Sequence, residues 1–384
     1  MSAPHAPILP GVTIGCLGGG QLGRMTALAA RAMGYDFVTL DPDPDCSARP
    51  VATRTFTAKW NDVKAATELA ALADVVTLEI EQIPRATLDA VAALKPLRPG
   101  ADAVYLVQDR ARQREWLARE GFPQGAFRTV VNAEECASAI AAQGPSIVKS
   151  AHGGYDGRGQ ARVREASEGA AAWTAVGGGC AVVEQFLDIK TELSVLVARR
   201  ADGVAVVYPP SRNHHTHGVL TWAVTPSGAS GEREREATAL AQAIAERLGI
   251  VGLLAVELFV LHDGRLLVNE LAPRPHNTYH HADRANATSQ FEQLVRAVCG
   301  LPLGSTELVV PGAIHNLLGD LWVNGQAPDF AAALAVRGVR VHLYGKRESR
   351  PGRKMGHLSS VGATADEALA RVCEAYAALI PKGP

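Results

Sequence analysis

Cysteine is scarce in this sequence, and the six cysteines are scattered without a single Cys-x-x-Cys pair. Neither a disulfide framework nor a zinc knuckle fits that pattern. We therefore expect all six to be buried as small apolar side chains: Cys16, Cys46, Cys136, Cys180, Cys299 and Cys373.

Long apolar runs and an excess of one charge sign are also missing. The longest apolar stretch, at residues 251–261, is interrupted by Glu257 and is too short to span a bilayer. Lys and Arg number 38 against 39 Asp and Glu, a net charge of −1, which argues against a general nucleic-acid binder. Residues 1–10 have neither the basic nor the apolar region of a signal peptide. We expect a cytoplasmic protein that binds neither membranes nor nucleic acid.

What is present is enough chain for two or three globular domains. The 384 residues are 47% apolar and 20% charged, which is typical of folded proteins. Residues 12–17 and 37–40 have the pattern of strands that flank a helix at 21–33, and this βαβ order predicts a parallel sheet. Strands and short turns predominate from residue 181, so an α+β region follows the α/β one. Other predicted helices cover 109–119, 133–142, 232–248, 289–298 and 366–379, and other strands 75–80, 146–149 and 339–344.

A glycine fingerprint lies at the first strand-to-helix junction. Gly18, Gly20 and Gly23 follow the strand and open the helix, and Asp41 ends the next strand. Taken alone, this pattern predicts a dinucleotide whose phosphates lie at the helix N-terminus. The alternative is a tight turn without a ligand, and a nicotinamide cofactor would leave the rest of the chain unexplained.

A lysine and a second glycine-rich loop indicate a nucleotide site in the middle of the chain. Lys149 ends a strand and precedes GGYDGRGQ at residues 153–160. Backbone N–H groups of such a loop can surround phosphate oxygens, and the lysine adds a point charge. The loop lacks the ending of a Walker loop, and a plain hairpin tip is the alternative. A strand end at 184–187, followed by Glu192, could hold a purine and its ribose.

Two carboxylates are expected to face each other across a hairpin. A two-residue type I′ turn at Asp263-Gly264 places Glu257 opposite Glu270, with Cβ atoms about 5 Å apart. Two such charges are destabilising unless a cation neutralises them. With Asn269 beside them they form an oxygen-rich site suited to Mg²⁺. The alternative is that Glu257 points to solvent or pairs with an arginine such as Arg274.

A basic segment near the C-terminus predicts a phosphate site. Its five cations are interrupted by Pro351-Gly352, a fixed turn that would bring the charges together on a phosphomonoester, although a solvated charge run has the same composition. These cations are Lys346, Arg347, Arg350, Arg353 and Lys354.

Six histidines suggest a zinc site at first sight. They lack a helical His-Glu-x-x-His spacing and nearby cysteines, so we interpret them as polar lining of an active site. They are His214, His215, His217, His276, His280 and His281.

Taken in order, these segments resemble an ATP-grasp enzyme, and specifically the family of N5-carboxyaminoimidazole ribonucleotide synthases. The resemblance covers nearly the whole chain. It is carried by GGGQLGRM (18–25), TLEIEQIP (77–84), GGYDGRGQ (153–160), VEQF (183–186), YPPSRNHHTHGVL (208–220), NELAPRPHN (269–277), SQFEQ (289–293) and RPGRKMGHL (350–358).

Two departures from the family pattern stand out. Thr278-Tyr279-His280 replaces the usual Ser-Gly-His, so a phenol takes the place of a glycine. Ser150-Ala151-His152 replaces the basic or threonine residues that commonly follow the lysine, which leaves one cationic contact near the phosphates open.

The resemblance implies an ATP-grasp fold with a Rossmann-like N-terminal domain at 1–105. It further implies a small lobe with the glycine loop at 106–190, a large lobe with the metal site at 191–310 and a small C-terminal domain at 311–384. The implied reaction condenses ATP, bicarbonate and 5-aminoimidazole ribonucleotide into the N5-carbamate, ADP and phosphate through carboxyphosphate, in purine biosynthesis. A homodimer is expected on the same basis.

Site residues carry over position by position. ATP is expected at Arg114, Lys149, Gly154, Tyr155, Asp156, Gly157, Arg158, Gly159, Gln160, Glu184, Gln185, Phe186, Leu187, Glu192, His215, Asn269 and Glu270. Mg²⁺ is expected on Glu257 and Glu270. Bicarbonate and carboxyphosphate are expected at Arg274, His276 and Asn277, with Lys149 and Asp156 as further catalytic residues, and Asp156 as a group that assists proton removal. The ribonucleotide is expected at Gln21, Glu81, Tyr155, Asp156, Arg158, Lys346, Arg353 and Lys354.

Three alternatives stay open at this point. A sister ATP-grasp ligase would activate formate for glycinamide ribonucleotide. A nicotinamide oxidoreductase would use the N-terminal fingerprint. A non-catalytic nucleotide sensor is disfavoured because Lys149, Glu257, Glu270 and Arg274 are all retained.

Overall fold

The computed structural model describes residues 6–154, 159–322 and 326–380. Its first unit is a parallel sheet in the order β3-β2-β1-β4, which confirms the predicted βαβ unit. The strands are β1 (Thr13–Leu17), β2 (Asp36–Asp41), β3 (Arg54–Thr57) and β4 (Val75–Leu78). The helices of this unit are α1 (Gln21–Ala32), α2 (Val63–Leu72) and α3 (Arg85–Ala92).

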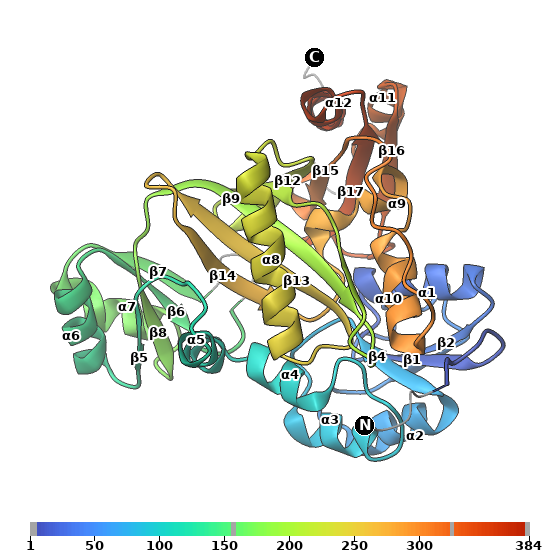
Figure 1. The fold of residues 1–384 in the computed structure, drawn as a ribbon, viewed down its shortest axis with the longest axis horizontal. Coiled ribbons are helices and arrows are strands. Elements are labelled where there is room, and N and C mark those ends of the chain that lie inside the picture. The colour runs from blue at the N-terminus through green and yellow to red at the C-terminus, as the bar shows by residue number, and fades with distance from the viewer. Residues whose placement is uncertain (1–5, 155–158, 323–325, 381–384) are drawn as a thin grey trace.

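The second unit is a small lobe that stands to one side of the molecule (Figure 1). Its antiparallel sheet has the order β5-β8-β6-β7, and its helices α6 and α7 lie at the far end of the lobe from the rest of the chain (Figure 1). The elements are β5 (Phe127–Val130), α6 (Ala133–Gln143), β6 (Ser146–Ser150), β7 (Gln160–Val163), α7 (Gly169–Ala175) and β8 (Ala181–Gln185). Helices α4 (Ala101–Val107) and α5 (Arg110–Arg119) lead into it.

The third unit is a nine-stranded sheet that also includes the C-terminal strands. Its order is β14-β13-β9-β11-β12-β15-β17-β16, with β10 on β9. The strands are β9 (Ile189–Arg199), β10 (Ala205–Val207), β11 (Ser211–Thr216), β12 (Val219–Thr225), β13 (Gly252–Leu261), β14 (Leu266–Ala272), β15 (Gly312–Leu318), β16 (Val339–Leu343) and β17 (Lys354–Val361). The helices are α8 (Gly231–Arg247), α9 (Ala282–Ala285), α10 (Gln290–Cys299), α11 (Phe330–Ala335) and α12 (Ala365–Ala378).

The β13–β14 hairpin has the predicted pairing of the two glutamates but a different loop length and register. Glu257 does lie opposite Glu270, but the two-residue turn is wrong. Leu261 N–H donates to the carbonyl of Arg265, so the loop has three residues, with Gly264 at φ +89°. This shifts the register by one, and a β-bulge at Asn269 shifts it back. Bulges re-aim side chains in this way beside functional sites.

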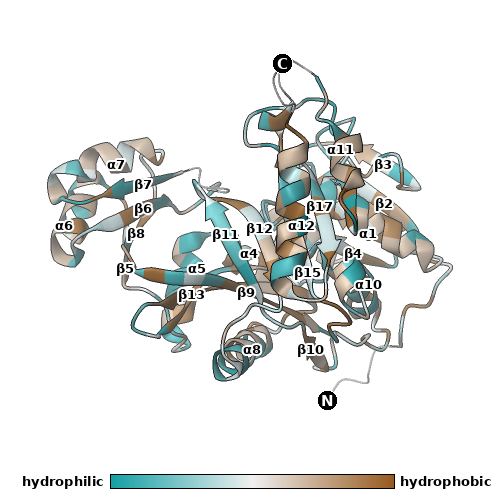
Figure 2. Ribbon diagram, turned by 90° about the horizontal axis from the view of Figure 1, so that it is seen from above, coloured by the Kyte–Doolittle hydropathy of each residue, from teal (hydrophilic) through white to brown (hydrophobic). Residues whose placement is uncertain are grey.

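Packing joins the N-terminal sheet to the large sheet but leaves the small lobe separate. One buried cluster contains Phe37 of β2 together with Leu196 of β9, Leu253 of β13 and Leu294 of α10. The small lobe has its own cluster around Val148 and Val183. Figure 2 shows hydrophilic residues along the exposed helix α8 and hydrophobic ones along β9 behind it.

The cysteine prediction is only partly correct. Four of the six are buried, whereas Cys180 is half-buried and Cys373 is exposed. Within the described part of the chain, no helix is both long and apolar enough to cross a membrane.

Candidate active site

A buried carboxylate, Glu184 on β8, lies at the centre of the predicted nucleotide region. Lys149 Nζ on β6 lies 2.8 Å from its Oε2, and Arg114 Nε on α5 lies 2.8 Å from its Oε1. Arg110 adds a bidentate contact at 2.6 and 3.0 Å. Burial raises the pKa of Glu184, but the three cations outweigh it and hold that pKa well below its usual range.

The same cluster makes Lys149 unusual. Burial, together with the nearby Arg110 guanidinium, lowers the pKa of Lys149 to about 8, although Glu184 opposes the shift. Strand β6 pairs with both β7 and β8, so the lysine is fixed beside Glu184. The structure therefore brings together Arg114, Lys149 and Glu184 as predicted.

Sequence reasoning missed Arg110. Its guanidinium contacts Glu184 and also lies 3.3 Å from Asn269 Oδ1 and 3.8 Å from Glu270 Oε2. It thereby links the small lobe to the β13–β14 hairpin. The signal was available, because Arg110 and Arg114 are four residues apart and such residues share one face of a helix.

The facing carboxylates form the second part of the site. Asn269 Nδ2 donates to Glu257 Oε2 at 3.2 Å, so the bulge turns the amide toward the pair. The Glu257 side chain is 18% exposed and that of Glu270 is 48% exposed. Burial, reinforced by Glu270 and Glu192 and opposed by His215, raises the pKa of Glu257 to about 7.

This donor set fits a cation that is shared with phosphates. No group of three or more His, Cys, Asp or Glu side chains arranged to hold a metal occurs among the described residues. Two carboxylates and an amide are nonetheless enough for Mg²⁺, which usually takes one or two carboxylates and completes its shell with water and substrate phosphates. Burial and the facing Glu270 both raise the pKa of Glu257, and a cation bound between the two carboxylates would favour the charged form.

His215 and Glu192 form a pair next to the hairpin. His215 Nδ1 contacts Glu192 Oε2. Burial lowers the pKa of His215, but this contact and the nearby Glu257 outweigh burial, so the pKa is raised overall. Strands β11 and β9 bring the two together through the Asn213–Glu192 register. Both predicted residues thus lie at one place.

Arg274 pairs with Glu81, which excludes the alternative in which it neutralises Glu257. Its Nε and Nη2 atoms lie 2.7 and 3.1 Å from the two Glu81 oxygens. Burial raises the pKa of Glu81, but Arg274 and then Lys354 lower it below its usual range overall. The pair joins the segment after β4 to the segment after β14.

His276 and Asn277 follow directly. His276 Nε2 lies 3.4 Å from Glu257 Oε1 and its Nδ1 lies 2.8 Å from Thr278 Oγ1. Burial and the Arg274 and Lys354 cations lower the pKa of His276 well below its usual value, so the ring is neutral.

The two departures from the family pattern find physical roles. Tyr279 is fully buried, and its hydroxyl donates to the carbonyls of Ser194 and Pro209. The phenol therefore fills the core behind the site. His152 Nε2 lies 2.7 Å from Asp109 Oδ2 and ties the start of the glycine loop to α5.

The basic segment reaches across to the N-terminal domain. Lys346 Nζ donates to Gln21 Oε1 at 2.8 Å and to the carbonyl of Lys354 at 2.7 Å. Arg353 Nη2 lies 4.0 Å from Asp43 Oδ2. Gln21, Lys346 and the Lys354 backbone therefore lie together, whereas the Arg353 side chain contacts Asp43 and the carbonyl of Glu348.

Some predicted residues receive less support. Tyr155, Asp156, Gly157 and Arg158 lie outside the described residues, and Gly154, Gly159 and Gln160 flank them. Gln185 and Phe186 are exposed at the end of β8, and Leu187 is half-buried.

Carboxylates of the protein itself occupy the N-terminal glycine fingerprint. Glu79, after β4, accepts the N–H of Gly20 and, at 2.6 Å, that of Gly23, while Asp41 accepts that of Gly19 at 2.8 Å. A Cβ at Gly18 or Gly20 would overlap the Glu79 side chain. The glycines therefore admit Glu79 where a dinucleotide phosphate would lie.

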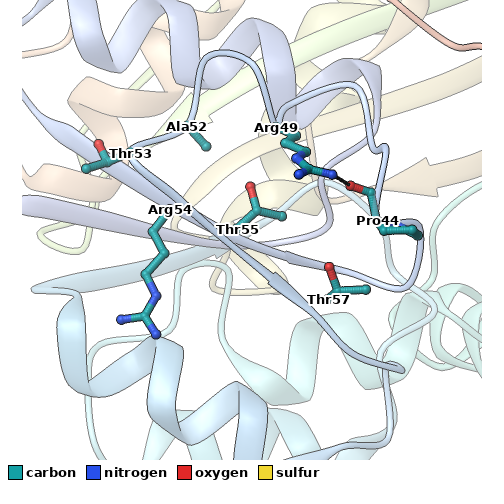
Figure 3. A pocket seen from close by; sticks show the side chains of 7 residues that line it. All are labelled: Pro44, Arg49, Ala52, Thr53, Arg54, Thr55 and Thr57. Carbon is teal, nitrogen blue, oxygen red and sulfur yellow. Dashed lines mark hydrogen bonds between the residues drawn. The ribbon is translucent and has the colours of Figure 1, made fainter.

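A hollow of about 380 Å³ lies elsewhere, on the edge of the N-terminal sheet (Figure 3). Its lining contains no predicted site residue, so we assign it no role. It is lined by Pro44, Arg49, Ala52, Thr53, Arg54, Thr55 and Thr57.

Family profiles match the chain in three consecutive parts. A ribonucleotide synthetase preATP-grasp domain matches residues 12–108, an ATP-grasp domain residues 115–291, and a phosphoribosylaminoimidazole carboxylase C-terminal domain residues 312–371. Fold and site thus define an ATP-grasp enzyme.

Relatives specify the family. An N5-carboxyaminoimidazole ribonucleotide synthase from Brucella melitensis is 39% identical over 92% of this chain and 97% of its own. A Staphylococcus aureus N5-carboxyaminoimidazole synthetase bound to ADP has a TM-score of 0.90 at 32% identity, covering 98% of this chain and 100% of its own. The Aspergillus clavatus enzyme with ADP and 5-aminoimidazole ribonucleotide has a TM-score of 0.88 at 29% identity, covering 96% and 98%.

The chain belongs to the N5-carboxyaminoimidazole ribonucleotide synthase family. It is an ATP-dependent ligase that makes N5-carboxyaminoimidazole ribonucleotide from 5-aminoimidazole ribonucleotide, bicarbonate and ATP in purine biosynthesis. The formate-activating ligase and the nicotinamide oxidoreductase are thereby set aside, and the occupied glycine fingerprint gives a physical reason against the latter.

Proposed function

We propose that ATP binds between the small lobe and the β13–β14 hairpin, with Mg²⁺ on Glu257 and Glu270. The observation that supports this most is the cluster of Arg110, Arg114 and Lys149 beside the facing carboxylates. Mg²⁺ bound there would neutralise phosphate charge. Lys149 and Arg110 would stabilise the charge that develops on the transferred phosphoryl group, which is the main protein contribution to such transfers.

The bicarbonate site is proposed at Arg274, His276 and Asn277. Phosphoryl transfer to a bicarbonate oxygen gives carboxyphosphate, and Arg274 would hold its negative charge. The amine of the ribonucleotide then forms a bond to the carbon as the bond to phosphate breaks. Neutral His276 would accept or donate a hydrogen bond without adding charge. Asp156, in the glycine loop, is proposed to assist proton removal.

The ribonucleotide is proposed to lie between the N-terminal domain and β17. Its phosphate would contact Lys346, Arg353 and Lys354, and its amine would lie near Glu81. Support comes from the Lys346–Gln21 hydrogen bond and from the influence of Lys354 on the pKa of Glu81, because a cation that acts on Glu81 lies within electrostatic reach of it.

The substitution Lys354→Ala tests this assignment. It should raise the Michaelis constant for the ribonucleotide about 10- to 150-fold, the value of a charge-assisted hydrogen bond, and leave that for ATP nearly unchanged. ADP release in bicarbonate buffer measures both.

Two controls accompany this measurement. Arg350→Ala removes an exposed cation that pairs with Glu348 and should leave both constants unchanged. The dephosphorylated riboside should be a poor substrate that Lys354→Ala barely affects. Equal losses on nucleotide and riboside would refute the phosphate assignment.

Homodimer formation and cytoplasmic location are proposed from the family resemblance alone. Sedimentation velocity tests the first, and fractionation of the source cells tests the second. The division into units at 1–105, 106–190, 191–310 and 311–384 is proposed on the same basis, and limited proteolysis tests it.

A further inference from the structure

Gln290, the first residue of α10, is fully buried and holds the backbone of His276. Its Oε1 accepts the His276 N–H at 2.8 Å, and its Nε2 donates to the His276 carbonyl at 2.9 Å. A backbone N–H can only donate and a carbonyl can only accept. The backbone therefore fixes which end of the Gln290 amide is oxygen and which is nitrogen.

This orientation determines the tautomer of His280. The same Nε2 atom of Gln290 lies 3.2 Å from His280 Nδ1. Because an amide nitrogen only donates, Nδ1 must accept, and in a neutral imidazole the proton is then on Nε2. His280 Nε2 lies 3.0 Å from Asn277 Oδ1 and donates to it.

The surroundings keep the His280 ring neutral. It stacks on His357 at 4.5 Å and on Phe291 at 5.8 Å between ring centroids. Burial, assisted by His342, Lys354 and His281, lowers the pKa of His280 to about 3. A neutral ring has one donor and one acceptor, so the chain of hydrogen bonds from Gln290 has a single direction.

The chain ends at Asn277. Its Oδ1 is engaged by His280, and among the described residues the Asn277 side chain makes no hydrogen bond besides this one, so its Nδ2 amino group is left as a donor. Asn277 thus offers a donor, beside Arg274 and His276 in the sequence. Bicarbonate and carboxyphosphate are rich in acceptor oxygens, and a rotated amide would present an oxygen to them instead.

We propose that His280 is a positioning residue, which Gln290 holds in the Nε2–H tautomer so that Asn277 directs its amino group toward the bicarbonate oxygens. The proposal rests on the bicarbonate assignment made under Proposed function. It adds two residues that touch no substrate and that determine which polar atom the site presents.

Nitrogen NMR on the ¹⁵N-histidine-labelled enzyme tests the tautomer independently of activity. The signals of His280 are assigned by their absence in His280→Phe or, should that variant not fold, in His280→Gln. Chemical shifts of a neutral ring protonated at Nε2 are expected. A ring protonated at Nδ1, or a charged ring, would overturn the proposal whatever the kinetics show.

Kinetics in buffer depleted of carbon dioxide test the consequence. His280→Phe keeps a stacking ring, and should raise the Michaelis constant for bicarbonate about 10-fold, the size of one lost hydrogen bond, without changing that for ATP. The matched control is His342→Phe, which alters the other end of the stack at 4.7 Å from His357 and should leave both constants unchanged.

Asn277→Ala distinguishes failure of the positioning role of His280 from failure of the bicarbonate assignment. If it raises the bicarbonate constant while His280→Phe does not, the positioning role is wrong and the bicarbonate site stands. If Asn277→Ala itself leaves the constant unchanged, the bicarbonate assignment fails and the proposal fails with it.

Discussion

At the scale of single residues, the site is organised by charges that compensate one another across long sequence distances. Glu184, for example, forms ion pairs with three cations: Arg110, Arg114 and Lys149. A buried carboxylate with one cation removed becomes costly, because the remaining charge is not solvated. Removing any one of the three cations is therefore expected to cost more stability than removing an exposed surface charge.

Arg110→Ala should weaken both stability and ATP binding. The loss of a charge-assisted hydrogen bond to buried Glu184 is expected to reduce the free energy of unfolding by about 2 kcal/mol. Denaturant unfolding and ATP titration measure the two effects. Arg119→Ala, at the exposed end of the same helix, is the control, and an equal effect of both variants would contradict the role of Arg110.

The His215–Glu192 pair should make stability depend on pH. Glu192 raises the pKa of His215 above its ordinary value of 6.5, so the folded state holds the proton more tightly than the unfolded chain. The stabilisation is complete below pH 6.5 and disappears as the pH rises through the folded-state pKa. The stability difference between wild type and His215→Gln should shrink over that window.

Glu192→Gln provides the control for this pH effect. In that background the same comparison should lose most of its pH dependence, because the hydrogen bond that does most to raise the His215 pKa is weakened and only the influence of Glu257 remains. A slope that persists unchanged would assign the effect to another group.

At the scale of elements, the β13–β14 hairpin places the carboxylates by combining a three-residue loop with a bulge. Each shifts the register by one residue, and the shifts cancel. Asn269 is the extra residue, and its side chain contacts both Arg110 and Glu257. The bulge therefore places the Asn269 side chain between Arg110 and Glu257, and it is not needed to pair the two strands.

Deletion of Asn269 should separate pairing from function. The strands can then pair regularly with Glu270 still opposite Glu257, so the fold and the melting temperature should be retained. Turnover should fall, and a higher Mg²⁺ concentration should be needed for half-maximal activity, because the amide and the local twist are lost. Thermal unfolding and ADP release at varied Mg²⁺ test this.

Asn269→Ala, which keeps the bulge but removes the amide, shows how much of the loss belongs to the backbone. A deletion variant with unaltered Mg²⁺ dependence would contradict the role of the bulge.

The hairpin also shows how far sequence reasoning reaches. The Asp-Gly dipeptide predicted a hairpin and the facing glutamates, and the six predicted helices end within one residue of their observed ends, whereas α2, α3, α4, α7, α9 and α11 were not predicted. The bulge could not be predicted, because its extra residue, Asn269, contacts Arg110, which lies 159 positions away in the sequence. The same holds for Glu79, whose partners lie 56 and 59 positions earlier.

At the scale of the whole molecule, two regions that are packed together to different degrees face each other across the proposed ATP site. The N-terminal sheet and the large sheet share a buried cluster, whereas the small lobe has its own. The lobe meets the hairpin largely through Arg110, Arg114 and the short pairing of Gln124 with Val268. Relative motion of the lobe is therefore the expected response to nucleotide.

Hydrogen exchange should reveal this division. Amides of β6, β7 and β8 should exchange faster than those of β1 and β13 in the free enzyme, because fewer buried contacts hold the lobe. ADP with Mg²⁺ should slow exchange mainly in the lobe. Uniform protection across the chain would contradict a separately moving lobe.

The Glu79 carboxylate at the head of α1 has a consequence for how glycine-rich junctions are interpreted elsewhere. A domain that supplies its own anion to these N–H groups has no vacancy for a phosphate, however good its glycine spacing. Annotation by that spacing alone would therefore misassign it as a redox protein. An acidic residue directly after the neighbouring strand distinguishes the self-filled junction from one that awaits a cofactor.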